Sequence, residues 1–459
     1  MAETPENTRK DLVEADGLYY TQDFSLNKLN ILVSSGKKFE MKRLLVEMSY
    51  YEDIYSFAVS GYLTLNDSQG FIETLQLTGN EFIEVEFGKL KSSGAVDSQT
   101  FRIYKIGNRT PKGNFNGEIY TIYFCSEELM LSEQMKISRA YSGYKISDIV
   151  KDVLIEKLNV PPNKIKIDAT KGLYDFVVPK LKPFETLSWL STYAIPDTMG
   201  SISADMLFFE NQYGFNYRSL RSMFAEPIYA TYKYQQQNLD LKTQSPQEKF
   251  TSVLQYEFVK SFDTLGDTSA GTYANRLISI DPLTRSYKIT DFDSFNPSAN
   301  MLNSNPAFNF SKNRFGKTQN QMYEASLKVV TSNASEKFIP YISSRVGSVA
   351  NDIRIETYVP MRTAAINLAN YIVAKLIIPG DAGITAGRTI NFNLMSVKPT
   401  INDRDLDKIY SGKYLVTAVR HIIQNNIYQT ILEIAKDSSP TRLGGIDNND
   451  PNRIAAAKQ

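Results

Sequence analysis

The chain has 459 residues, a length that suggests about three domains. Apolar residues make up 42% and charged residues 22%, as in ordinary globular proteins, so the composition excludes wholesale disorder. Lys and Arg number 51 and Asp and Glu 50, which gives a net charge of +1 and no overall field to hold nucleic acid or an anionic membrane. No apolar run reaches the ~18 residues of a membrane-spanning helix, and the polar start does not resemble a secretory signal.

Two scarce residue types narrow the function further. Cys125 is the only cysteine, which excludes an intrachain disulfide framework. His421 is the only histidine, which excludes His-rich zinc sites and leaves one candidate base for any catalytic triad. The 28 Tyr and 25 Phe residues favour half-buried strands. The composition is therefore typical of a β-rich assembly protein rather than an enzyme.

The N-terminal part is predicted to be an arm, at residues 1–37, followed by a first β-barrel domain at 38–137. In the latter, Leu45 begins a strand-like run, and Tyr55, Phe57 and Val59 alternate as on one face of a second strand. Further strands are expected at 81–87, 101–107 and 118–124, with a short helical turn at 71–75.

A compact α+β module is predicted at residues 138–237. Ser147 is the expected cap of a helix over 148–158, which Pro161 and Pro162 end. A short strand follows at 164–168. Pro183 begins a second helix that should bury Trp189, and residues 206–220 resemble a hairpin turning at Asn211–Gly214.

A second β-barrel domain is predicted at residues 238–437. Its expected strands are 250–262, 271–283, 389–397, 413–423 and 427–437, with a helix over 362–376 that is broken by Gly380 and Gly383. Residues 291–350 are rich in Asn, Ser and Pro and are interpreted as an insertion. Residues 438–459 are predicted to be a flexible C-terminal tail.

Residues 39–126 and 250–437 share an order of elements: two strands, a helix, then three strands. At an offset of 308, Gly79 matches Gly387, and Ile119-Tyr120 matches Ile427-Tyr428. A chance alignment of β-segments is the alternative to a duplication. Two similar barrels in one chain would let a closed ring of three chains present six similar surfaces, and so join a trimer to a hexamer.

Three stretches of the chain share the layout of one protein family. They are PFETLSWLSTYAIP (183–196), SVLQYEFVKSFDTLGDTSAGTYANRLISIDPLTRSYK (252–288) and SGKYLVTAVRHIIQNNIYQTILEIAKD (411–437). On these residues the chain resembles the baseplate hub proteins of contractile-tailed bacteriophages, and the related hub region of type VI secretion spike proteins. The likeness covers most of residues 38–437 and rests on layout rather than on a single motif.

The resemblance implies a β-rich α+β fold: two similar tube-type barrels and the intervening module, forming a homotrimeric ring. It implies a structural role in which the ring joins the hexameric tail tube to the trimeric central spike and leaves a lumen for the genome. The expected partners are a second and third copy, the tube protein and a spike on a separate chain, with the tape measure protein and other baseplate proteins as further candidates. DNA is expected only as passing cargo, without membrane insertion, in a virion assembled in the host cytoplasm.

A peptidoglycan- or glycan-binding tail protein with weak hydrolase activity is the alternative function. The sequence leaves open whether the particle is a phage or a phage-derived injection machine. It also leaves open which residues line the lumen and form the trimer contacts.

Two motifs resemble ligand sites only in part. Gly316-Lys317-Thr318 resembles the end of a phosphate-binding loop, but Ser311 occupies the position of its first glycine. Asp403, Asp405 and Asp407 have the spacing of the first calcium-loop ligands, but Lys408 and Tyr414 replace the required Gly and Glu. We interpret both as loops and predict no cofactor or metal site.

No catalytic residue is predicted. Cys125 is expected to be a small buried hydrophobe and His421 a packed strand residue, neither with a visible partner for nucleophilic chemistry. The adjacent carboxylates Glu127 and Glu128 are a poor acid–base pair, because neighbours in a strand or helix diverge; a helix start explains them better.

Overall fold

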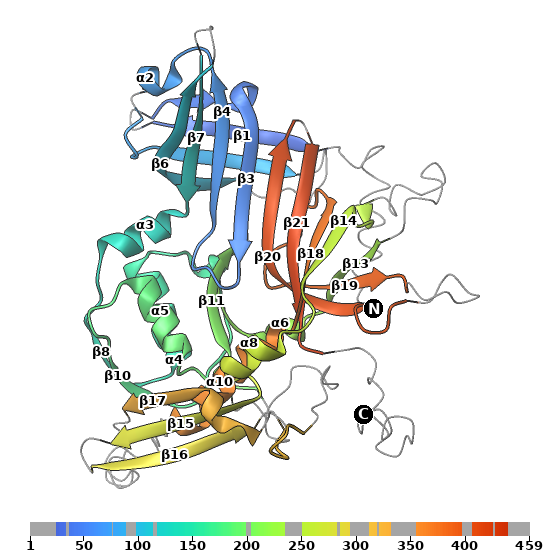
Figure 1. Ribbon diagram of the computed structural model, residues 1–459. Coiled ribbons are helices and arrows are strands. Elements are labelled where there is room, and N and C mark those ends of the chain that lie inside the picture. Colours follow the sequence, from blue (N-terminus) through green and yellow to red (C-terminus); the bar gives the residue numbers. More distant parts are fainter. Residues whose placement is uncertain are drawn as a thin grey trace, which may run out of the picture.

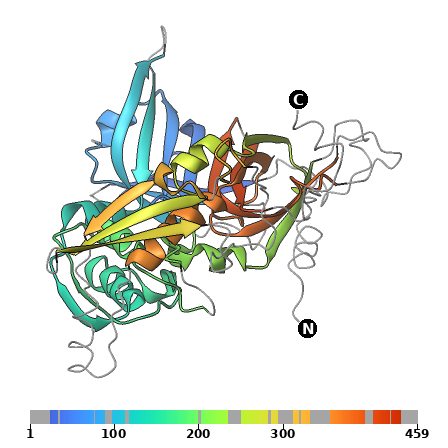
Figure 2. The same cartoon turned by 60° about the horizontal axis from the view of Figure 1, so that its bottom comes forward.

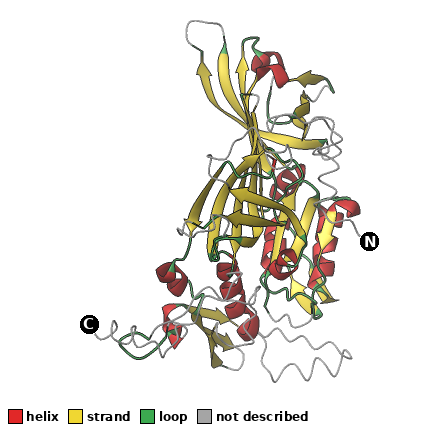
Figure 3. Ribbon diagram, turned by 90° about the vertical axis from the view of Figure 1, so that its right-hand side faces the viewer, coloured by secondary structure: helices red, strands yellow, loops and turns green. Residues whose placement is uncertain are grey.

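The computed structural model shows a β-rich protein in which a large sheet spans two units and an α+β module packs beside them (Figures 1 and 3). The structure describes residues 24–33, 36–75, 77–88, 98–112, 117–198, 203–234, 250–281, 285–293, 312–318, 321–331, 355–396, 406–425 and 427–438.

The first unit is an antiparallel sheet around a hydrophobic core. Its elements are β1 (Ser25–Leu32), β2 (Lys38–Glu40), η1 (Lys42–Leu44), β3 (Leu45–Asp53), β4 (Ser60–Asp67), α2 (Phe71–Leu75), β5 (Phe82–Gly88), β6 (Gln99–Pro111) and β7 (Glu118–Cys125). In β5 the predicted alternation is confirmed, because Ile83, Val85 and Phe87 are buried and the glutamates between them are not.

Two local predictions in this unit were wrong. Part of the range assigned to an arm forms β1, which pairs with β5 and buries Leu29 and Ile31, so burial rather than local polarity decides its state. The residues around Tyr55 and Phe57 form a turn instead of a strand. The Asp53 carboxylate accepts a hydrogen bond from the Tyr55 N–H at 2.7 Å, a side-chain contact that favours a turn.

The module packs helices against two small sheets. Its elements are α3 (Glu127–Gln134), β8 (Ala140–Tyr144), α4 (Ile146–Asp152), the π-turn η2 (Val153–Lys157), η3 (Pro162–Lys164), β9 (Ile165–Ile167), β10 (Tyr174–Val177), α5 (Pro183–Ser191), β11 (Met206–Asn211), β12 (Gly214–Ser219) and α6 (Leu220–Phe224). The hairpin with its Asn211–Gly214 turn is confirmed. Ser147 is not the cap, because the helix already begins at Ile146.

The second unit surrounds another hydrophobic core. Its strands are β13 (Ile228–Tyr234), β14 (Gln255–Lys260), β18 (Ile372–Pro379), β19 (Thr389–Leu394), β20 (Gly412–Gln424) and β21 (Ile427–Lys436). The predicted helix over 362–376 was half wrong. The helix α10 (Ile355–Ala369) ends early, and the chain continues as β18, whose β-branched Ile372 and Val373 pair with β21.

A separate insert lies between β14 and β18 and comes forward in Figure 2. It contains α8 (Thr264–Ser269), β15 (Ala274–Asp281), β16 (Ser286–Asp293), η5 (Tyr323–Ala325), β17 (Leu327–Thr331) and α10. The strand predicted at 271–283 exists, but it pairs with β16 and β17 and not with the second unit. The insertion thus begins before the expected residue 291. Much of the 291–350 range lies outside the described residues.

The two units pair their strands in the same order. The order is β3-β4-β7-β6-β5-β1 in the first unit and β14-β18-β21-β20-β19-β13 in the second. Gly79 (φ 95°) and Gly387 (φ 86°), which match at the offset of 308, precede β5 and β19 in the same left-handed conformation. Five strands of each unit therefore pair as a duplicated unit would, all antiparallel, whereas the outermost pairs differ: β1 is antiparallel to β5 and β13 is parallel to β19. Closure of each unit into a barrel stays a prediction.

Candidate assembly interface

The two units meet at a single strand junction, where β3 and β20 lie side by side (Figure 1). The pairs run antiparallel from Ala418 opposite Asp53 to Gln424 opposite Glu47. Through this junction the strands of both units form one 13-stranded sheet. Backbone pairing, rather than side-chain packing alone, therefore joins one repeat to the other.

β20 is long enough to pair with two different strands along the edge that faces away from β21. Residues 412–415 pair with β19 inside the second unit, and residues 418–424 pair with β3 of the first unit. A register irregularity between Val416 and Ala418 separates the two halves. Such a bulge bends a strand and lets it pass from one sheet partner to another.

One face of the junction is polar. The Arg420 Nη2 lies 3.2 Å from the Glu47 Oε1 and donates to the Tyr62 hydroxyl at 3.0 Å. Its guanidinium also lies 5.4 Å from the centre of the Tyr51 ring. These charge-assisted and cation–π contacts fix the register on this side.

The opposite face is apolar and contains His421. The His421 Nδ1 lies 2.9 Å from the Tyr428 hydroxyl, and its ring lies 5.5 Å from that of Phe87. Burial lowers the pKa of His421 to about 4, so the ring is neutral at physiological pH. It acts as a packed residue of the junction. Cys125 lies away from the junction, at the end of β7, where it pairs with Ser60 of β4 and Arg102 of β6. Burial raises the pKa of its thiol to about 11.

A buried carboxylate joins three parts of the chain behind the junction. The Glu52 carboxylate accepts hydrogen bonds from the Gln212 N–H at 2.7 Å and the Ala386 N–H at 2.9 Å. It therefore connects β3 to the β11–β12 turn and to the loop before β19. Burial, the largest effect, raises the pKa of Glu52 to about 7. Sequence reasoning missed this residue, since a glutamate in a strand gives no signal of burial.

Glu210, on β11, is a second carboxylate of this region and is half-buried. It accepts a hydrogen bond from the Val59 N–H at 2.9 Å, and burial, reinforced by the charge of Glu128, raises its pKa to about 8. Glu128 thus acts electrostatically on a residue distant in sequence, while burial above all, with the charge of Glu127 as a lesser cause, raises the pKa of Glu128 itself. Both Glu127 and Glu128 lie in the first turn of α3, the helix start that the sequence indicated.

Among the strand edges that carry no partner within the part of the chain that the structure describes are those of β14 and β6. β14 pairs with β18 on one side, and the outer half of β6, beyond Ile103, pairs with β7 on one side. Leu254, just before β14, leaves 46% of its surface exposed. Exposed edges and apolar side chains beside them are typical of assembly surfaces.

The outward face of the joined sheet is hollowed and mixed in charge. A cavity of 560 Å³ spans β14, β18, β21, β20 and β3. Its lining carries the acidic residues Glu52, Asp53, Glu257 and Glu433 beside the basic residues Lys375 and Arg420. Because acidic residues outnumber basic ones, this face offers few cations to bind a polyanion.

The two incomplete ligand motifs form local turns where the structure describes them. The Asn313 Oδ1 accepts hydrogen bonds from the N–H groups of Phe315 and Lys317, which closes the loop around Gly316. The Asp407 carboxylate accepts from two N–H groups of its own turn, while Asp403 and Asp405 lie outside the described residues. In the described part, no cluster of three potential metal-ligating side chains occurs. No described helix has the length and apolar character to span a bilayer.

The fold is similar to that of two tail proteins of known structure. The 43 kDa tail protein of prophage MuSo2 from Shewanella oneidensis superposes with a TM-score of 0.52 at 8% identity, over 90% of this chain and 99% of that one. The tail protein from Neisseria meningitidis MC58 gives a TM-score of 0.50 at 10% identity, over 90% of this chain and 97% of that one.

A curated relative agrees in sequence over nearly the whole length. The "Probable baseplate hub protein gp334" of Vibrio phage KVP40 is 24% identical over 431 residues, which cover 91% of this chain and 95% of the relative. No family model matches the chain. The resemblance to phage baseplate hub proteins that the sequence indicated is thereby confirmed.

Proposed function

We propose that this chain is the structural baseplate hub of a contractile tail, a homotrimeric adaptor between the hexameric tube and the trimeric central spike. The observation that carries the proposal is the β3–β20 junction. It joins the first unit to the second within one chain, and it leaves the corresponding edges, β14 and the outer half of β6, without a partner in the described residues. The baseplate hub relative and the tail-protein fold support the same role.

The shared strand order defines which residues correspond. Tyr51 pairs with Ser60 on β4, and Ser60 pairs with Cys125 on β7. In the second unit Glu257 pairs with Lys375 on β18, which pairs with Glu433 on β21. Cys125 and Glu433 are related by the offset of 308, so Glu257 of β14 is the counterpart of Tyr51 on β3.

The partner strand gives a second correspondence in the same way. Arg420 pairs with Ile431 on β21, and Lys105 pairs with Tyr123 on β7, again at the offset of 308. Lys105 of β6 is thus the counterpart of Arg420. Each strand also carries a register irregularity, directly before Lys105 in β6 and two rows before Arg420, between Val416 and Ala418, in β20. Since Arg420 lies opposite Tyr51 within the chain, Lys105 of one chain would lie opposite Glu257 of the next.

This arrangement supports a closed ring of three. If the second unit contacts the next chain's first unit as the two units contact each other within the chain, six similar units follow one another around an axis. A head-to-tail contact whose rotation closes forms a ring, and three chains supply six units. Opposite charges at Lys105 and Glu257 favour this pairing, and strand addition supplies its backbone hydrogen bonds.

The ring would place the mixed-charge face of the joined sheet toward a lumen. Each Lys or Arg that contacts phosphate adds salt-dependent affinity for DNA, so a face whose acidic residues outnumber its basic ones lets the genome pass without holding it. In this proposal each unit is a tube-type barrel, and the module and the insert lie on the periphery. The tube, the separate spike, the tape measure protein and other baseplate proteins are the proposed partners, in a virion assembled in the host cytoplasm.

A double cysteine variant, Lys105→Cys with Glu257→Cys, tests the ring. Directly opposite residues of antiparallel strands bring their Cα atoms within the ~4.4–6.8 Å that a disulfide spans. After oxidation, denaturing gels should show covalent species of two and three chains and none larger. Each single variant is the control and should give at most dimers.

Three outcomes would overturn the proposal. Light scattering could show a monomer at every dilution, even with tube and spike proteins present. The cross-linked ladder could continue beyond three chains, as an open polymer would. A stable trimer could form without any cross-link, which would mean that other strands make the contact.

A further inference from the structure

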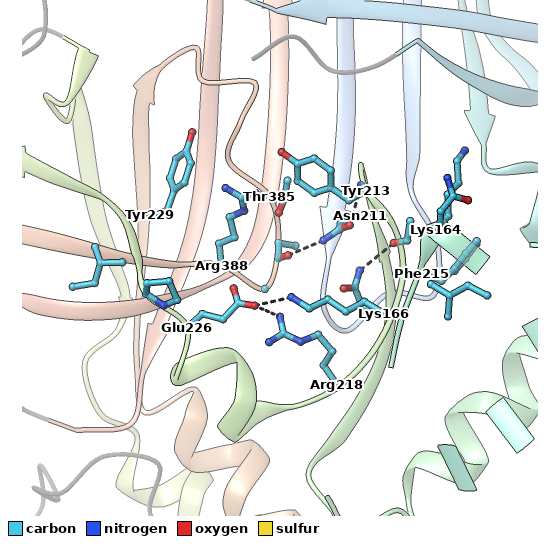
Figure 4. Close-up of a pocket in the computed structure, with 18 residues that line it drawn as sticks. Lys164, Lys166, Asn211, Tyr213, Phe215, Arg218, Glu226, Tyr229, Thr385 and Arg388 are labelled. Carbon is cyan, nitrogen blue, oxygen red and sulfur yellow. Dashed lines mark hydrogen bonds and ion pairs between the residues drawn. The ribbon is translucent and has the colours of Figure 1, made fainter. Parts of the chain in front are cut away.

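A pocket of 830 Å³ lies where the module meets the second unit (Figure 4). Its walls are the start of β9 with the two residues before it, the β11–β12 turn with β12, the segment before β13 with the start of that strand, and the loop before β19. The volume lies within the ~300–1,000 Å³ of ligand pockets. At Gly214, in the turn, an added Cβ would lie 2.1 Å from the Lys164 carbonyl oxygen. The turn and the segment before β9 are therefore too close for any side chain at this position.

The charge of this pocket is predominantly positive. Lys164, Lys166, Arg218 and Arg388 line it, against Glu226 as the acidic residue of the lining. The Glu226 carboxylate is already engaged, since its Oε1 lies 2.8 Å from the Lys166 Nζ and 2.7 Å from the Arg218 Nη1. Figure 4 shows both cations reaching it from the module side. Arg218 is 6% exposed, and its buried Nε has no hydrogen-bond partner among the described residues.

Arg388 faces the same space from the second unit. Its guanidinium lies 5.2 Å from the centre of the Tyr213 ring and 4.9 Å from that of Tyr229. No described carboxylate forms an ion pair with Arg388 or with Lys164 within 4 Å. Two aromatic rings hold the guanidinium in place while its donors stay available for an anion.

We propose that this pocket binds a short acidic peptide segment of a partner baseplate protein. Arg388 and Lys164 would pair with carboxylates, and Tyr213, Tyr229 and Ile228 would contact the apolar parts of the segment. The identity of the partner as a baseplate protein rests on the proposed function, whereas the binding chemistry rests on the pocket alone. A nucleic acid strand fits less well, because the cations gather in one enclosed pocket and do not follow a groove along which a backbone could run.

Fluorescence anisotropy with the full chain tests the proposal. The probe is a fluorescein-labelled hexaglutamate peptide, compared with hexaglutamine of the same length and with a labelled oligothymidylate. Hexaglutamate should bind, hexaglutamine should bind at least about tenfold more weakly, and added salt should weaken the binding. Arg388→Gln should weaken hexaglutamate binding by about tenfold, since it removes a bidentate donor.

Arg102→Gln is the matched control and should leave binding unchanged. Arg102 also stacks on an aromatic ring, with its guanidinium 4.5 Å from the centre of Phe82, but it lies outside the pocket. Equal binding by Arg388→Gln and the wild type would overturn the proposal, as would oligothymidylate binding as tightly as hexaglutamate. Light scattering separates the two proposals. A trimer without peptide binding refutes the pocket alone. A chain that binds the peptide but stays monomeric, even with tube and spike proteins present, refutes the ring alone.

Discussion

Leu254 provides a quantitative test of the ring. Glu257 of β14 corresponds to Tyr51 of β3, so Leu254, three residues earlier, corresponds to Met48. Met48 is fully buried and pairs with Ile423 of β20. Leu254 itself is 46% exposed in the single chain, so the ring should bury this remainder. Full burial of a Leu side chain contributes roughly 1.5–3 kcal/mol, and 46% of that is about 1 kcal/mol per contact.

A Leu254→Lys substitution removes this contribution and brings an ammonium group to the closing edge, which adds a desolvation cost. Over three equal contacts the trimer should lose at least about 3 kcal/mol, a hundredfold change in its dissociation constant. Because the half-trimer concentration follows the square root of that constant, it should rise by at least about tenfold. Light scattering across a dilution series measures this concentration.

Leu327→Lys is the matched control. Leu327 lies on β17 of the insert and is 54% exposed, so the same change in size and charge falls on a surface that the ring does not use. Its half-trimer concentration should equal that of the wild type. A trimer that withstands Leu254→Lys as well as Leu327→Lys would refute the correspondence of β14 with β3.

Three further outcomes follow from the buried residues. Gly61→Ala would place a Cβ 2.3 Å from the Phe124 ring, so it should lower the free energy of unfolding by about 1–3 kcal/mol. Gly107→Ala, whose Cβ would lie 3.4 Å from its nearest neighbour, should change it little. Equal losses in thermal unfolding would contradict this packing. Burial raises the pKa of Glu210 from 4.5 to about 8, so the folded state favours its protonated form. The free energy of unfolding should therefore fall as pH rises from about 5 to 9, and it should fall less steeply in Glu210→Gln. The pKa of His421, lowered to about 4, predicts that the single histidine NMR signal will not titrate between pH 6 and 8; a midpoint near 6.5 would mean that the ring is exposed.

Elements with a strong local pattern could be predicted from the sequence. Alternation in β5 and the turn residues Asn211–Gly214 depend on neighbours within a few positions, and the structure agrees with both. The match of Gly79 with Gly387 also held, because a left-handed residue needs glycine wherever the same turn recurs.

Only the tertiary structure decided which strands pair and where elements end. Residues 370–376 suit a helix locally, yet they form β18 because β21 offers a buried edge for Ile372 and Val373. The burial of Glu52 and the gathering of Arg388 with the module's cations depend on segments more than 150 residues apart. Periodicity within a sequence therefore determined the kinds of element and their repetition, whereas long-range burial and strand pairing decided the insert, the junction and the pocket.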